Sequence, residues 1–389
     1  MENWRMALPE GAMELLGRLR AAGHEGWAVG GCVRDALLGL EPKDYDLCTD
    51  ATPEQMRAAF AGLRVIETGI AHGTLTVIAD GTPYEVTTYR VDGAYTDHRR
   101  PDSVEFVREV ERDLMRRDFT VNAMAYSPEA GLLDCFGGRE DLRNGVIRCV
   151  GEPGARFDED ALRILRALRF AAVYGFTVED GTARAARERK GSLGLVARER
   201  VTAEMSKLLC GRAAERIVCE FGEVIEAALG VRLHVRGLDG VPAELPLRLA
   251  HALQYGSDAE RALGALRLDR ATERAVRELI ASADRACPQG DAAWRHLLHE
   301  LGQERALQLA RWKGWPLAGA RAVLTRGDCW SLRQLAVTGR DLTEMGMEPG
   351  RQVGCALEAL LEAVMDGRVD NERGALLALA KKQAGRAGK

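Results

Sequence analysis

The stretch VGGCVRDALLGLEPKDYDLCTD, residues 29–50, places a glycine pair, an Arg-Asp pair and an Asp-x-Asp motif close together. GWAVGG predicts a short strand that runs into the glycines, and VRDALLG predicts a helix that stops at Gly39. DYDLCTD has the alternating pattern of a strand. The stretch is either an ordinary turn followed by a strand with two surface acids, or a phosphate-binding turn that faces a metal site.

The residues around this stretch extend the same mixed pattern. MELLGRLRAAG predicts an amphipathic helix that ends at Gly23. TPEQMRAAF predicts a helix with Thr52 as its N-cap and Gln55 at the third position. Further strands are expected in RVIET, in DSVEFV and in a hairpin that turns at Asp80-Gly81. Residues 1–150 therefore predict a mixed α/β domain with an antiparallel share.

From about residue 155 the pattern changes to helical periodicity, beginning with DEDALRILRALRFAAVYG. Strand signals nearly vanish, and no fixed-period repeat is present. The predicted fold class is α+β, with a small mixed-sheet head followed by an all-helical remainder. The basic tail KKQAGRAGK is expected to be disordered.

The composition indicates a soluble globular protein. Of 389 residues, 46% are hydrophobic and 29% are charged, and the net charge is −4. We expect neither a membrane span, because no apolar run is long enough, nor a signal peptide in MENWRMALPEG. Nine cysteines without a C-x-x-C pair predict reduced, mostly buried thiols in a cytoplasm and no zinc site. The 54 Lys and Arg residues leave room for a local nucleic-acid surface.

Three acids are candidates for a metal site. Asp44 and Asp46 are expected on one strand face, where their like charges repel unless a cation lies between them. Such a pair suits two-metal catalysis with magnesium, which prefers oxygen ligands. In YEVTTYR, Glu85, Thr87 and Tyr89 are expected on one face. Glu85 either completes the metal site, takes a proton from an attacking hydroxyl, or lies on a wet face without a role.

Glycines and arginines are candidates for phosphate binding. Gly30 and Gly31 follow a strand and precede a helix, which allows a phosphate to approach backbone N–H groups. Arg34 lies one turn into that helix, and Asp35 is expected to orient it or to cap locally. The pattern is neither G-x-G-x-x-G nor a Walker loop.

A second basic motif, MRRDFTVNAMAY, adds three charged residues before an apolar stretch. Arg116 and Arg117 suit a triphosphate, and Asp118 suits a ribose hydroxyl or the positioning of an arginine. The alternative is a helix end with exposed charges.

In EDALRILRALRF, Asp160, Arg163, Arg166 and Arg169 recur every three residues. Asp160 and Arg163 are expected to be helical neighbours that form a planar pair. A forked donor beside an acceptor matches the hydrogen-bonding edges of cytosine and adenine, whereas uracil and guanine present an acceptor where the aspartate needs a donor. The alternative is a surface salt bridge worth a few tenths of a kcal/mol, about 0.3.

These motifs occur in the order and spacing of a known family. VGGCVRD with DYDLCTD, EVTTYR, RRDFTVNAMAY, EDALRILRALRFAA and RERVTAEMSKLL together resemble the class II tRNA nucleotidyltransferases. These are the CCA-adding enzymes and their poly(A) polymerase relatives, in the DNA polymerase β-like superfamily. The C-terminal segment that starts at TGRDLTEMGMEPG also looks like that of the family, so the resemblance covers nearly the whole chain.

The resemblance implies a head with a five-stranded mixed sheet, followed by neck, body and tail. We expect the head at 1–150, the base-recognising neck at 151–212, the body at 213–300 and a tRNA-binding tail at 301–389. The implied catalytic residues are Asp44 and Asp46, which bind Mg²⁺, and Glu85. The implied nucleotide-binding residues are Gly30, Gly31, Arg34, Arg117, Asp118, Asp160, Arg163, Arg166 and Arg169.

The function implied is addition of CCA to the 3′ end of tRNA from CTP and ATP. Poly(A) polymerase, A-only and CC-only activities stay open, as does a catalytically silent RNA-binding protein, although the intact acids speak against silence. The loop with Asp97, His98, Arg99 and Arg100 favours full CCA addition, since CC-adding relatives lack much of it. The oligomeric state is left open.

Three further residues are expected to be structural. His251 in LRLAHALQYG lacks the H-D motif of a metal phosphohydrolase and is expected to pack in a helix. Trp312 and Trp315, at three-residue spacing, either belong to a core or stack on RNA, and the spacing favours the core.

Overall fold

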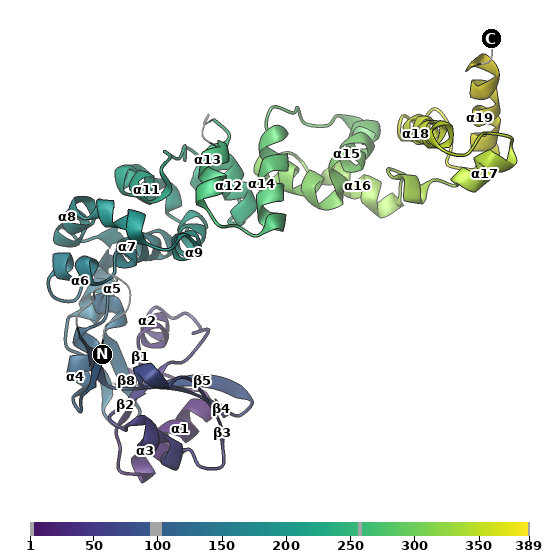
Figure 1. The fold of residues 1–389 in the computed structure, drawn as a ribbon. Helices are drawn as coiled ribbons and strands as arrows, with labels where there is room; N and C mark the ends of the chain where they lie inside the picture. Colours follow the sequence, from purple (N-terminus) through teal and green to yellow (C-terminus); the bar gives the residue numbers. More distant parts are fainter. Residues whose placement is uncertain (1–3, 94–102, 256–258, 388–389) are drawn as a thin grey trace. The chain divides into compact units, whose positions relative to one another are not determined.

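The computed structural model describes residues 4–93, 103–255 and 259–387 (Figure 1). The chain divides into two compact units. The first comprises residues 1–239 and 256–268, and the second comprises residues 240–255 and 269–389. The α+β class predicted from the sequence is confirmed, since a mixed sheet is followed by a mostly helical remainder.

A seven-stranded sheet organises the N-terminal part of the first unit. Neighbouring strands are antiparallel except β2 and β5, which are parallel. The expected count of five strands was too low, because outer strands extend the sheet at both edges. In spatial order the strands are β3 (Arg64–Gly69), β4 (Thr74–Ala79), β5 (Thr82–Thr88), β2 (Leu47–Thr49), β1 (Gly26–Val29), β8 (Met124–Ser127) and β9 (Gly131–Asp134).

Strand β2 is shorter than the sequence predicts. Only Leu47–Thr49 pairs with both neighbouring strands, so Asp44 and Asp46 lie in the segment that leads into it. Strand β5 likewise ends at Thr88, and Tyr89 is fully buried instead of sharing the face of Glu85. The alternating pattern continues beyond both strands, and the backbone pairing sets their ends.

The predicted helices around the sheet are present. The helix α1 (Glu10–Ala21) ends before Gly23, and α3 (Pro53–Ala59) has a capping box formed by Thr52 and Gln55. The other helices of this region are α2 (Gly31–Leu37), α4 (Val110–Met115) and α5 (Gly138–Asn144). The strands β6 (Arg90–Asp92) and β7 (Val104–Phe106) form a separate antiparallel pair.

The rest of the first unit is helical with one exception. The strands β10 (Val146–Ile147) and β11 (Thr177–Val178) pair in parallel. The sequence predicts an all-helical neck, and β11 is the exception to that prediction. The helices are α6 (Pro153–Glu159), α7 (Leu162–Tyr174), α8 (Asp180–Glu188), α9 (Arg198–Leu209), α10 (Ala214–Glu220), α11 (Gly222–Leu229) and α13 (Ala259–Ala265). Short 3₁₀ turns complete the unit at 70–72, 120–122, 190–195 and 238–240.

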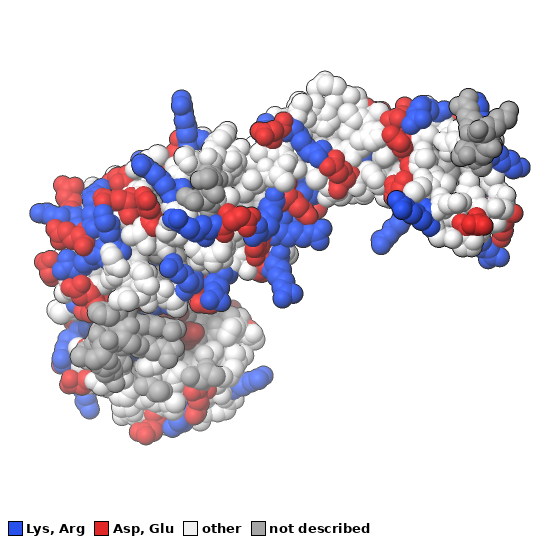
Figure 2. Space-filling view, turned by 45° about the horizontal axis from the view of Figure 1, so that its top comes forward, with Lys and Arg blue, Asp and Glu red and all other residues white. Residues whose placement is uncertain are grey.

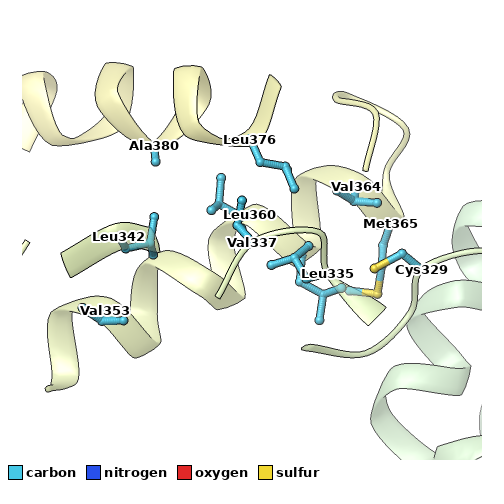
Figure 3. Packing of buried hydrophobic residues seen from close by; sticks show 11 residues of the cluster. Cys329, Leu335, Val337, Leu342, Val353, Leu360, Val364, Met365, Leu376 and Ala380 are labelled. Carbon is cyan, nitrogen blue, oxygen red and sulfur yellow. The ribbon is translucent and has the colours of Figure 1, made fainter. Parts of the chain in front are cut away.

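The second unit is built from helices α12 (Leu245–Leu253), α14 (Arg270–Ala281), α15 (Gly290–Trp312), α16 (Ala318–Arg326), α17 (Gly339–Glu344), α18 (Arg351–Met365) and α19 (Arg373–Ala387). The expectation of disorder in the segment 381–389 is wrong for residues 381–387, which belong to α19, and residues 388–389 lie outside the described residues. Figure 3 shows Leu376 and Ala380 of α19 pointing into a buried apolar cluster with Leu342 and Leu360. Burial of these apolar positions stabilises the helix despite its basic end.

His251 and Trp312 pack as predicted, whereas Trp315 is only partly buried. His251 lies in α12 and its Nδ1 is 3.3 Å from the indole Nε1 of Trp312, which donates to it. Trp312 is buried, and Trp315 is half-buried with its ring edge-on to Trp294.

Acidic and basic side chains are mixed over the face of the molecule in Figure 2.

All nine cysteines are free thiols, but only Cys32, Cys48, Cys149 and Cys329 are buried, so the expectation of mostly buried thiols was too strong. Within the described ranges, no helix has the length and apolar character required to cross a bilayer.

Candidate active site in the head and neck

The three candidate acids meet at the start of the parallel strand pair. Leu47 of β2 lies opposite Val86 of β5, so the residues just before them, Asp46 and Glu85, lie side by side. The backbone carbonyl of Asp46 accepts a hydrogen bond of 2.9 Å from Val29 N, which fixes the approach to β2. Asp44, Asp46 and Glu85 are all solvent exposed, whereas Tyr84 and Val86 on either side of Glu85 are buried.

The electrostatics of Asp46 reflect this grouping. Surrounding protein atoms and the charges of Asp44 and Glu85 raise the pKa of Asp46 to about 6, against a lowering effect of Arg117. The Asp46 side chain is nevertheless open to water, so we attribute more weight to the like charges than to burial. A cation beside these carboxylates would relieve their repulsion.

Within the described residues, no three His, Cys, Asp or Glu side chains form a ready metal-binding group. The three acids therefore interact as charges without forming a closed cage. Their donor set consists of carboxylate oxygens only, which fits a hard divalent cation such as Mg²⁺ or Ca²⁺ and does not fit zinc.

Gly30 makes room for Arg117 beside these acids. Gly30 has φ 79° and ψ −121° at the N-cap of α2, and a Cβ there would lie 2.9 Å from Arg117 Nη1. Gly31 has an ordinary helical conformation, and a Cβ there would lie 3.6 Å from Arg34 Nη2. Arg117 is held by the buried Asp113, whose Oδ2 accepts from Nη2 at 3.2 Å.

Arg34 is buried and fixed by two neighbours. Its Nε donates to Asp35 Oδ1 at 2.9 Å, as expected for an aspartate that orients it, and Nη1 donates to Asn122 Oδ1 at 2.6 Å. The guanidinium also lies against the rings of Phe170 and Tyr174 on α7. Arg34 therefore connects the glycine turn to the neck helix.

Asp118 positions an arginine of the neck, which was one of its two predicted roles. Its Oδ2 accepts from Arg166 Nε at 2.8 Å, and its Oδ1 accepts from Asn122 Nδ2 at 3.1 Å. Asn122 thereby bridges Arg34 and Asp118. A continuous hydrogen-bonded chain runs from Asp35 through these residues to Arg166.

The predicted pair of Asp160 and Arg163 is not formed as expected. The helix breaks at Asp160, which has φ −144° and ψ 104° between α6 and α7. Its carboxylate accepts from Leu162 N at 3.1 Å and from Arg200 Nη2 at 2.7 Å.

Arg163 instead donates to Glu159, one turn earlier, and to the carbonyl oxygen of Arg156 at 3.2 Å. Asp160 lies two residues before α7, whereas Arg163 lies in the first turn of α7. The break in the helix separates their side chains because Asp160 is outside the helical register.

The three arginines of α7 share a face, as their spacing predicts. Arg163, Arg166 and Arg169 are partly exposed, whereas Leu162, Leu165 and Leu168 are buried. Arg169 pairs with Glu204 of α9 and lies 3.7 Å from the centre of the Phe170 ring. Asp97, His98, Arg99 and Arg100 lie outside the described residues.

Comparisons with known proteins identify the family of the chain. The family described as "Poly A polymerase head domain" matches residues 26–148, and "tRNA nucleotidyltransferase domain 2" matches residues 247–380. The CCA-adding enzyme of Geobacillus stearothermophilus is 38% identical over 390 residues, which span 93% of this chain and 94% of that protein. That of Limosilactobacillus fermentum is 36% identical and spans 95% and 96%.

The chain belongs to the family of CCA-adding enzymes. It resembles the crystal structure of the Bacillus stearothermophilus CCA-adding enzyme in complex with CTP, with a TM-score of 0.82 and 33% identity over 98% of this chain and 99% of that one. The Thermotoga maritima CCA-adding enzyme complexed with tRNA, at 21% identity and a TM-score of 0.65, shares the fold. As a member of this family, the protein is a tRNA nucleotidyltransferase.

Sequence reasoning missed several partners of the family motifs. Asn122 lies inside the quoted motif RRDFTVNAMAY, yet nothing local indicates that it bridges two distant charges. Tyr174 and Arg200 are far along the chain from the residues that they contact, Asp35 and Asp160. Asp113 was detectable, since it lies three and four residues before the two arginines that it binds.

Proposed function

We propose that this chain adds C, C and A in turn to the 3′ end of tRNA, without a nucleic-acid template, from CTP and ATP. The observation that supports this most is the convergence of Asp46, Glu85 and Arg117 beside the glycine turn. Arg34, in the helix that follows this turn, contacts α7, which carries the candidate base-reading residue Arg163.

CCA-adding nucleotidyltransferases depend on divalent metal, and we propose Mg²⁺ for this one. Asp44 and Asp46 are the residues proposed to hold it, with Glu85 as the third carboxylate. The pairing of β2 with β5 supports this, because it places Asp46 beside Glu85. When bound, Mg²⁺ supplies positive charge at the attacking hydroxyl and at the departing pyrophosphate.

The reaction transfers one nucleotide at each step. The 3′ oxygen of the tRNA gives its proton to a carboxylate of the site, for which Glu85 is the candidate, and forms a bond to the α-phosphorus. The bond from that phosphorus to the bridging oxygen of the β-phosphate breaks, and pyrophosphate leaves. We assign Arg34 and Arg117 to the negative charge of the triphosphate and of the pyrophosphate that leaves. Gly30 and Gly31 keep the approach to both arginines open.

Base choice is assigned to Asp160 and Arg163, with Arg166 and Arg169 beside them on α7. In the described structure these two residues are bound to Arg200 and Glu159. Reading a cytosine or adenine edge therefore requires part of those contacts to be exchanged for contacts to the base. Asp118 supports this face by holding Arg166.

We keep the four-part division of the chain as a proposal. The head at 1–150 carries the reaction, the neck at 151–212 reads the base, and the body at 213–300 and tail at 301–389 bind tRNA. Shape and phosphate contacts, more than base reading, are expected in the last two parts.

The deciding experiment supplies purified protein and Mg²⁺ with tRNAs that end before CCA, after C and after CC. Each substrate is given CTP alone, ATP alone and both. Full CCA addition predicts that CTP alone extends the first two, that ATP alone extends only the third, and that both together complete all three. Poly(A) synthesis, A-only addition and CC-only addition each produce a different pattern. If none of the substrates is extended, the proposed enzymatic activity is refuted.

Two substitutions locate the chemistry. Asp44→Ala should abolish both C and A addition, whereas Glu54→Ala, which removes an exposed acid from α3, should leave both intact. Arg163→Ala should relax the choice of base, and Arg184→Ala, at an exposed position of α8, serves as its control. Unchanged selectivity in Arg163→Ala would remove the base-reading assignment.

A further inference from the structure

The surroundings of Arg34 contain more than its two hydrogen-bond acceptors. A guanidinium has five N–H donors. Asp35 accepts hydrogen bonds from Nε and from one N–H of Nη2, and Asn122 accepts one from Nη1. Among the described residues, no acceptor is supplied for the second hydrogen on each Nη atom. These two N–H groups are the donors available to a bound phosphate.

Two aromatic rings of α7 lie against this guanidinium. Its Cζ lies 5.1 Å from the centre of Phe170 and 4.9 Å from that of Tyr174. The rings are one helical turn apart and nearly parallel, at 15°. A cation over two aromatic faces gains attraction from both, and the contact opposes rotation of the planar group.

Tyr174 differs from Phe170 in having a second route to Arg34. Its hydroxyl donates to Asp35 Oδ1 at 2.9 Å, the oxygen that also accepts from Arg34 Nε. Burial, together with Asp35, raises the pKa of Tyr174 to about 12, so the hydroxyl keeps its proton and remains a donor at neutral pH. Tyr174 therefore holds the cation through its ring and the counter-ion through its hydroxyl.

We propose that Tyr174 is a positioning residue for the nucleotide triphosphate, acting through Arg34 and Asp35. This inference rests on the proposed role of Arg34 in phosphate binding. Tyr174 ends α7, the helix that carries Arg163 in its first turn. One helix thus contacts the proposed phosphate-binding arginine at its C-terminal end and presents Arg163, one of the two candidate base-reading residues, at its N-terminal end.

The proposal predicts how the effect divides between substrates. Since the triphosphate is common to CTP and ATP, loss of the hydroxyl should affect both equally and leave the choice between them unchanged. Arg34 is not proposed to contact the tRNA, so tRNA binding should not change. Tyr174→Phe keeps the ring and removes only the bond to Asp35, whereas Tyr174→Leu removes both contacts.

The experiment measures kcat and KM for CTP, ATP and tRNA in the full-length chain. Tyr174→Phe is expected to raise KM for both nucleotides roughly three- to tenfold, the range of one hydrogen bond, with KM for tRNA unchanged. Tyr174→Leu should raise both further. The matched control is Tyr84→Phe, which removes another buried hydroxyl that contacts the backbone of Ala12 in α1, and it should change neither KM.

A double-mutant cycle tests whether Tyr174 acts through Arg34. Once Arg34→Ala has removed the cation, Tyr174→Phe should add little to the rise in KM. An additive effect, a change in C-to-A preference or an unchanged nucleotide KM in Tyr174→Phe would overturn the proposal. If Arg34→Ala alone leaves KM unaltered, the assignment of Arg34 fails instead, and absence of any nucleotide addition by the unmodified chain refutes the proposed function.

Discussion

Gly30 adopts a backbone conformation that glycine tolerates and other residues resist. Its φ of 79° is strained for an L side chain, and a Cβ would also meet Arg117 Nη1 at 2.9 Å. Gly30→Ala is therefore expected to destabilise the chain by about 1–3 kcal/mol and to displace Arg117. Because Arg117 is proposed to bind the triphosphate, its displacement should raise KM for CTP and ATP.

Gly39→Ala separates the two effects of the Gly30 substitution. Gly39 also has a positive φ, of 71°, but a Cβ there would meet nothing within 4 Å. We expect a comparable loss of stability in urea unfolding with no change in nucleotide KM. Equal kinetic effects in the two variants would show that backbone strain, and not the contact with Arg117, is responsible.

Asp118 should make folding sensitive to acid. Burial alone would raise its pKa, but the charge of Arg166 and hydrogen bonds from Asn122 and Arg166 lower that pKa from 3.8 to about 2. Because the folded pKa lies below the unfolded one, the contribution to stability is full above about pH 4. It is lost as the pH falls toward 2.

The measurement compares the free energy of unfolding of the unmodified chain and of Asp118→Asn between pH 6 and pH 2. At pH 6 the difference should be at most on the order of 2 kcal/mol, since Arg166 is 34% exposed and water screens part of the interaction. It should shrink below pH 4. A difference that stays constant over this range would contradict the pKa assignment.

Single residues show where the sequence was sufficient. The pairing of Arg34 with Asp35 was predictable because the two are adjacent in the chain. The bonds from Arg34 to Asn122 and from Tyr174 to Asp35 span 88 and 139 positions, and no local pattern encodes them. The pair of Asp160 and Arg163 was predicted wrongly, because periodicity does not reveal that one residue leaves the helix.

At the scale of elements, the helix α3 shows a local rule that is sufficient by itself. Thr52 Oγ1 accepts from Gln55 N at 3.4 Å, and Gln55 Oε1 accepts from Thr52 N at 2.8 Å. Thr52→Ala should destabilise the chain by about 1 kcal/mol. Equilibrium unfolding of Thr52→Ala, Gln55→Ala and the double variant checks this. The two losses should be less than additive, and a neutral Thr52→Ala would contradict it.

Other elements depend on contacts that no local rule contains. The helix α3 and the hairpin at Asp80-Gly81 were predictable from capping and turn residues. The helical end of the chain was not predictable. The basic composition of KKQAGRAGK predicts disorder, whereas burial of Leu376 and Ala380 favours a helix. The strand β2 was predicted too long because its ends are set by pairing with β1 and β5.

At the scale of the whole molecule, each of the two units contains an apolar core of its own. One cluster in the first unit includes Val29, Tyr89 and Leu114. The cluster in Figure 3 takes all its buried members from residues 329–380 of the second unit. The proposed chemistry uses only the first unit, whereas the proposed tail at 301–389 lies in the second. Damage to the second core should therefore spare nucleotide binding.

Leu360→Ala is the substitution that tests this separation. Leu360 is fully buried in the cluster, so truncation should destabilise its surroundings by about 2–5 kcal/mol. Leu332→Ala, at a leucine that is 40% exposed in the same unit, is the control and should have little effect. Hydrogen exchange should show faster opening of α17, α18 and α19 in Leu360→Ala, with protection of the sheet unchanged.

Kinetics then connect this core to function. If the tail binds tRNA as proposed, Leu360→Ala should raise KM for tRNA while KM for CTP stays at its original value, because the residues proposed to bind CTP all lie in the first unit. A parallel rise in both values would mean that the units unfold together. If exchange protection is lost in α17, α18 and α19 while KM for tRNA is unchanged, the proposal that the tail binds tRNA is wrong.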